Sequence, residues 1–144
     1  MRIGAALIVA ILMAIAGSPA SATQRITDDP GGQLGPYLQH LAAVRSSGEQ
    51  VVIDGPCLSA CTMVLGVIPR NRICVTPRAQ LGFHAAWRPD ASGNQVASRD
   101  GTELMMSKYP QQVRNWIAHR GGLSREMMYL SGRELASMYP SCPQ

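Results

Sequence analysis

The sequence has 144 residues, of which 46% are hydrophobic, and it carries a formal net charge of +4. This length suffices for one hydrophobic core and is too short for two, so we expect a single domain. The lysines and arginines are scattered along the chain, which excludes a basic face for nucleic acid.

The first 22 residues predict a secretory signal peptide. Arg2 is followed by an apolar stretch from Ala5 to Ala16, and Ala20-Ser21-Ala22 has the A-x-A form of a cleavage site. The apolar stretch is shorter than the ~20 residues that span a membrane. We therefore expect a mature domain at 23–144, periplasmic or secreted, with no membrane attachment after cleavage.

The elements of the first half follow from apolar runs and turn residues. They are an edge strand at 23–27, a turn at 28–32, a helix at 34–45, a strand at 50–54, a helix from Ser59 to residue 68, and strands at 72–76 and 81–84. Short β-branched runs separated by a helical segment predict an α/β fold with a mostly parallel sheet and flanking helices.

The second half is expected to be helical after an exposed loop at 87–101 that is rich in Pro, Asp, Ser, Gly and Asn. A helix with apolar residues from Met105 to Ile117 should kink or split at Pro110. Ser124 can cap a turn, and Ser131-Gly-Arg-Glu134 has the form of a capping box that starts a last helix to Met138.

The cysteines are all in the predicted mature domain, and an even number in an exported chain predicts disulfides. They are Cys57, Cys61, Cys74 and Cys142. Three pairings are open. Strand 72–76 beside strand 50–54 would place Cys74 near the Ser59 turn, so we expect a bridge from Cys74 to Cys57 or Cys61, with Cys142 taking the remaining one. A zinc site is disfavoured because the C-x-x-C spacing is absent, and we expect no metal or organic cofactor.

Two side chains carry candidate chemistry. Ser59 follows the carboxyl end of one strand, and His84 lies at the tip of a later one, where ligands bind in parallel sheets. A hydroxyl and an imidazole in this arrangement predict a nucleophile and its general base. The alternatives are a helix N-cap for Ser59 and a core histidine bound to a backbone carbonyl for His84.

Four segments in order resemble the Clp-type serine peptidases. They are Asp29-Pro-Gly-Gly32 before an amphipathic helix, Gly55-Pro-Cys-Leu-Ser59-Ala-Cys61, Leu81-Gly-Phe-His84, and Tyr129-Leu-Ser-Gly-Arg-Glu-Leu135. The likeness covers nearly the whole mature chain and is nearest to an exported bacterial branch of the Clp/crotonase superfamily. It implies a truncated Clp/crotonase-like fold, since only residues 23–28 precede the Gly-Gly turn.

The resemblance also implies a function. Ser59 and His84 would be catalytic, and backbone amides of Gly31, Gly32 and Ala60 would form an oxyanion hole. The substrate would be a peptide or protein, and the ring-like assemblies of the family imply a homo-oligomer.

The third catalytic residue is where the sequence departs from the family. Met127 occupies the position of the family's acid and cannot orient an imidazole. Asp90, Asp100 or Glu126 could supply the acid, although a solvated surface carboxylate is the favoured interpretation of each. Two hypotheses follow: a serine hydrolase, peptidase-like, that uses a Ser–His pair, or a non-catalytic binding or assembly module that has lost the acid.

Overall fold

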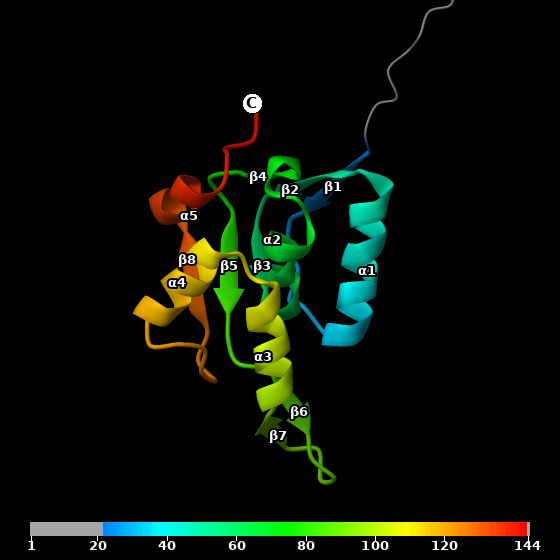
Figure 1. Ribbon diagram of the computed structural model, residues 1–144, viewed down its shortest axis with the longest axis vertical. Helices are drawn as coiled ribbons and strands as arrows, with labels where there is room; N and C mark the ends of the chain where they lie inside the picture. The colour runs from blue at the N-terminus through cyan, green and yellow to red at the C-terminus, as the bar shows by residue number, and fades with distance from the viewer. Residues whose placement is uncertain (1–21, 144) are drawn as a thin grey trace, which may run out of the picture.

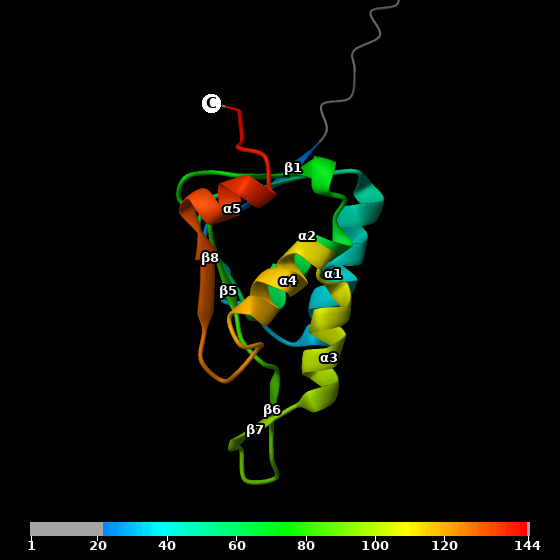
Figure 2. The same cartoon turned by 60° about the vertical axis from the view of Figure 1, so that its left-hand side comes forward.

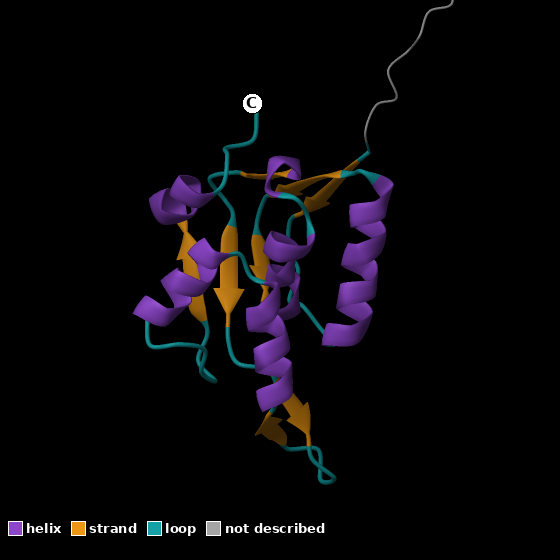
Figure 3. Cartoon of the chain, viewed as in Figure 1, coloured by secondary structure: helices purple, strands orange, loops and turns teal. Residues whose placement is uncertain are grey.

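The computed structural model describes residues 22–143 (Figure 1). The predicted signal peptide therefore lies, except for Ala22, outside the described residues. The described chain is a mixed α/β domain with two three-stranded sheets and one two-stranded ribbon. The two larger sheets run in different directions (Figure 3), and helices α1 to α4 lie on one side of the second sheet (Figure 2).

The first sheet is parallel throughout and has the order β1-β2-β4. Its strands are β1 (Thr23–Ile26), β2 (Gln50–Ile53) and β4 (Ile73–Val75). Helix α1 (Leu34–Ser47) connects β1 to β2 and ends at Gly48, whose φ of 80° places it in the left-handed region that favours glycine. The short helix η2 (Arg70–Arg72) precedes β4. These elements confirm the edge strand, the first helix and two of the strands predicted from sequence.

The second sheet has the order β3-β5-β8. Strand β3 (Pro56–Leu58) pairs with β5 (Gln80–Phe83) in parallel, and β8 (Met128–Ser131) pairs with β5 antiparallel. The sequence did not predict β8, because its pairing is with a strand far away in the chain. Ser131 starts helix α5 (Gly132–Met138), but its side chain makes no capping hydrogen bond, so the predicted capping box is wrong.

The chain passes from the first sheet to the second at Gly55. A Cβ atom there would lie 2.0 Å from the carbonyl oxygen of Thr27, so only glycine fits. The N-terminal segment makes the same passage, because Asp29 bridges to Cys57 beyond the end of β1. Residues 23–29 thus run parallel to residues 50–57 across both sheets.

Asp54 ties the end of β2 to its surroundings. It is 5% exposed, and its carboxylate accepts hydrogen bonds from Arg25, Arg78 and Thr76. The hydrogen bonds from Arg78, then from Thr76 and Arg25, hold the pKa of Asp54 well below its ordinary value of 3.8. The carboxylate is therefore charged at neutral pH and joins three segments at one point.

The segment 87–101 is more ordered than its composition predicts. It contains a ribbon of β6 (Trp87–Pro89) and β7 (Gln95–Ala97), which projects from the body of the molecule (Figure 1), and the start of α3 (Arg99–Lys108). The expectation of a loop was wrong because paired strands can form from polar residues when a turn joins them. Helix α4 (Gln111–His119) follows Pro110, which confirms the predicted split.

The core lies between the helices and the two sheets. Phe83 of β5 packs against Tyr109 and Trp116, with ring centroids 5.3 Å and 5.5 Å away. Helix α2 (Val64–Val67) approaches α3 so closely that a Cβ atom on Gly66 would lie 1.4 Å from the carbonyl oxygen of Lys108. This packing fixes the helices against the sheet edge where Ser59 and His84 lie.

The four cysteines form two disulfides, and the expected pairing was wrong. Cys57 joins Cys61 across the Ser59 turn, and Cys74 joins Cys142. The reason lies at the C-terminus, where the Val75 amide donates to Pro140 O and the Cys142 amide donates to Val75 O. The last residues thus run beside β4 and bring Cys142 to Cys74. Two disulfides fit a secreted or periplasmic protein.

Within residues 22–143, no helix is both long and apolar enough to cross a membrane.

The two disulfides should differ in their effect on stability. They close loops with sequence separations of 68 for Cys74–Cys142 and 4 for Cys57–Cys61. On the chain-entropy model the long loop stabilises by ~4 kcal/mol and the short one by ~2 kcal/mol. Urea unfolding should show a larger loss in the free energy of unfolding for the double variant C74A/C142A than for C57A/C61A. Equal losses in the two variants would contradict this prediction.

Candidate active site

Ser59 lies on a strained turn between β3 and the 3₁₀ helix η1 (Ser59–Met63). Its φ of 55° is the one positive φ of a non-glycine residue among the described residues. Such backbone costs about 1–2 kcal/mol for an L-residue, and it is found where the surrounding structure enforces it, often at functional sites. The sequence predicted a helix from Ser59, and the structure begins it with η1 and continues with α2.

Two interactions hold this turn in place. The buried Cys57–Cys61 disulfide spans it, with Cα atoms 5.3 Å apart. The Thr62 hydroxyl donates to the carbonyl oxygen of Ser59 at 2.6 Å and lies 2.6 Å from the hydroxyl of Tyr109. Burial raises the pKa of Tyr109 to about 12, so this phenol stays protonated at neutral pH.

The Gly31–Gly32 segment lies directly against the Ser59 turn. Gly31 has a φ of 82°, and a Cβ atom there would lie 2.5 Å from Leu58 O and 2.8 Å from Ala60 N. Asp29 orients the segment: its Oδ1 accepts the Gly31 amide at 2.8 Å, and its Oδ2 accepts the Tyr37 hydroxyl. The Gly31 amide is therefore already bound within the turn, and the predicted oxyanion hole would use the amides of Gly32 and Ala60.

His84 follows the carboxyl end of β5, as predicted. Its Nδ1 lies 2.8 Å from the carbonyl oxygen of Ala85. Because a carbonyl only accepts, Nδ1–H donates, and Nε2 of the neutral ring is left as the acceptor. The peptide unit that carries this carbonyl is itself anchored, because the Ala86 amide donates to the Thr102 hydroxyl at 2.9 Å.

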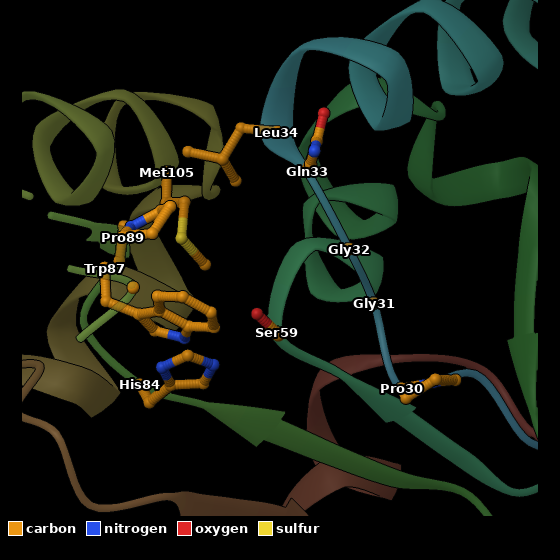
Figure 4. Close-up of a pocket in the computed structure, with 12 residues that line it drawn as sticks. Pro30, Gly31, Gly32, Gln33, Leu34, Ser59, His84, Trp87, Pro89 and Met105 are labelled. Atoms are coloured by element: carbon orange, nitrogen blue, oxygen red, sulfur yellow. The ribbon is translucent and has the colours of Figure 1, made fainter. Parts of the chain in front are cut away.

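One cavity brings these residues together. It has a volume of about 560 Å³, and Gly31, Gly32, Ser59 and His84 all contribute to its wall. Figure 4 shows the Ser59 hydroxyl pointing into the space between the Gly31–Gly32 backbone on one side and His84 and Trp87 on the other. The remaining wall is mostly apolar, with Leu34, Met105 and Pro89 among its residues. Ala60 is fully buried behind Ser59.

Among residues 22–143, no carboxylate is bonded to His84, and none lines either of the two cavities to which His84 contributes. Asp90 accepts hydrogen bonds from Ser92 and Asn94 in the β6–β7 turn, which hold its pKa below its ordinary value. Asp100 is exposed in the first turn of α3, and Glu126 is exposed beside Met127. Met127 lines a second cavity together with His84, and its Sδ would lie 2.8 Å from a Cβ atom on Gly82.

Residues 22–143 contain no group of three or more His, Cys, Asp or Glu that could hold a metal ion.

Sequence reasoning missed four residues that shape this site. Asp29 was seen only as part of a turn, although Asp before Pro-Gly-Gly can accept a backbone amide two residues later. Thr62 and Tyr109 are far apart in sequence, and no local pattern links them. Trp87 was placed in a loop, and only the β6–β7 pairing brings it to the cavity.

The two glycines of the turn should differ sharply on substitution. Gly31→Ala forces a Cβ atom against backbone at a positive φ, so it should lower the free energy of unfolding by at least about 1–3 kcal/mol. A Cβ atom on Gly32 meets nothing within 4 Å. Gly32→Ala should therefore remain within about 0.5 kcal/mol of wild type, measured by urea unfolding. Similar losses in both variants would contradict the close contact at Gly31.

Comparison of the sequence with models of protein families and with curated proteins gives no match. The functional argument for this chain therefore depends on the geometry of the site.

Proposed function

We propose that this protein is an exported serine hydrolase, peptidase-like, in which Ser59 and His84 carry out acyl transfer. The observation that carries the proposal is the cavity in which Ser59, on its strained turn, faces His84 and the Gly31–Gly32 segment. Strain of this kind at a half-buried serine that lines a cavity is expected of a nucleophile held in a sharp strand-to-helix turn. We also infer a Clp/crotonase-type fold, supported by the order of the Gly-Gly turn, the serine turn and the histidine strand.

The tautomer of His84 suits a general base. Nε2 is free to accept the Ser59 proton because Nδ1–H is held by the Ala85 carbonyl. Ser59 Oγ would then attack the substrate carbonyl carbon, and His84 would return the proton to the leaving group. A water molecule would hydrolyse the acyl-enzyme with the same histidine as base.

The developing oxyanion would be stabilised by backbone amides. Gly32 is the stronger candidate, since it lines the cavity and its amide is not held by Asp29. Ala60 follows the nucleophile and would be the second donor. Asp29 would act as a positioning residue that fixes the turn carrying Gly32.

A fluorophosphonate probe tests the proposal directly, because it reacts only with an activated serine. We expect the mature protein to be labelled, and Ser59→Ala to abolish labelling. Ser107→Ala, on the surface of α3, is the matched control and should be labelled as wild type. Absence of labelling in protein with a cooperative unfolding transition, or labelling that survives Ser59→Ala, would overturn the proposal.

The second candidate is a non-catalytic binding or assembly module, which Met127 favours. The Ala85 carbonyl can fix the tautomer of His84, but it carries no charge to stabilise the imidazolium. In a serine protease, replacing the orienting aspartate by asparagine lowers kcat by about 10⁴. A Ser–His pair without a carboxylate should therefore be slow. A peptide substrate and a homo-oligomer remain proposals under either candidate.

Introducing a carboxylate beside His84 should distinguish the hydrolase from the non-catalytic module. Met127→Asp should raise the hydrolysis of an activated ester by at least about tenfold, a small part of the ~10⁴ that an orienting aspartate contributes. Met127→Asn has the same size without the charge and should give no gain. Ser59→Ala in the Met127→Asp background should remove the gain. Equal rates in the Asp and Asn variants would favour the non-catalytic module.

A further inference from the structure

A second cavity shares part of its wall with the first. It has a volume of about 420 Å³, and His84, Ala86 and Trp87 contribute to the walls of both cavities. Its remaining wall comes from β7 and from the segment before β8, including Gln95, Arg125 and Met127. The two cavities therefore adjoin at His84 and its neighbours.

Arg125 gives this second cavity its charge. Among the described residues that line it, Arg125 is the one permanently charged side chain, and no carboxylate is present. The arginines at positions 25, 72, 78 and 120 each donate hydrogen bonds to oxygen atoms. Within residues 22–143, no hydrogen bond or ion pair of the Arg125 guanidinium is found. Arg125 is exposed and contributes to the cavity wall, and a guanidinium with five donors at such a place is suited to bind a carboxylate.

The path of proton transfer in the proposed mechanism indicates which part of a substrate would reach this cavity. The acyl group would occupy the first cavity, where the Gly32 amide and the apolar side chains lie. His84 must deliver its proton to the leaving group, so the leaving group lies on the side of the imidazole. A leaving group longer than a few atoms would extend past His84 into the second cavity.

We propose that the second cavity binds a carboxylate on the leaving-group side of the substrate through Arg125. The substrate class is a peptide cleaved close to its C-terminus, and the inference rests on the proposed hydrolase function. Ser59 Oγ bonds to the peptide carbonyl carbon, the C–N bond breaks, and the Ser59 proton passes through His84 to the departing nitrogen. The carboxylate itself is unchanged, and water then cleaves the acyl-enzyme to restore Ser59.

Binding can be measured without turnover in the Ser59→Ala variant. The probes are N-acetylated alanine pentapeptides with one leucine at positions one to four, each made with a free C-terminal carboxylate and with a carboxamide. Calorimetric titration should give at least one pair in which the carboxylate form binds about tenfold more tightly, the effect of one charge-assisted hydrogen bond. Arg125→Gln should remove the difference. Arg133→Gln is the matched control, because Arg133 is exposed and lines neither cavity.

The outcomes separate this inference from the function on which it rests. Equal binding of both forms in every pair, no binding at millimolar concentration, or a preference that survives Arg125→Gln would overturn the carboxylate site. Fluorophosphonate labelling of the control Arg133→Gln should equal that of wild type, because Arg133 lines neither cavity. A carboxylate preference without any labelling of wild type would support the site and overturn the hydrolase.

Discussion

The structure depends on the parallel run of residues 23–29 beside residues 50–58. Ile26 O accepts the Asp54 amide, the Asp29 amide donates to Pro56 O, and the Leu58 amide donates to Asp29 O. This pairing continues from one sheet into the other, past Gly55, where no side chain fits. It delivers the Gly31–Gly32 segment to the Ser59 turn, so the pairing of these two segments sets two walls of the cavity. Asp54 with its arginines and the Cys57–Cys61 bridge reinforce residues 50–58 at two points.

The elements that depend on local pattern were predictable from sequence. Helix α1, the apolar strands and the split at Pro110 follow from periodicity and from the chemistry of proline. Elements that depend on distant pairing were not. Strand β8 forms because β5 lies beside it, and the Cys74–Cys142 bridge forms because the C-terminal residues return to β4. The Clp/crotonase fold itself remains an inference from the resemblance.

The site was predictable in its residue types and less so in its details. Ser59, His84 and the Gly-Gly turn were located by motif and order, and the structure places them around one cavity. The sequence could not reveal that Asp29 uses the Gly31 amide, or that the Ala85 carbonyl selects the tautomer of His84. Both hydrogen bonds join residues that are close together in the sequence. They form only because tertiary contacts hold the surrounding segments in place. The sequence pointed to Met127 as the neighbour of His84, and the structure places both in the wall of a second cavity that no local pattern predicted.

The strand-like return of residues 140–142 to β4 has a consequence for the order of folding. One edge of β4 is paired with these residues, and the Cys74–Cys142 bond needs them as well. Domains commonly begin to fold from the N-terminus during synthesis. Here β1, β2 and β4 can be present before residues 140–142 have been made, and β4 then has an unpaired edge. That edge and the disulfide are completed together, late in folding, when the distant segment reaches β4.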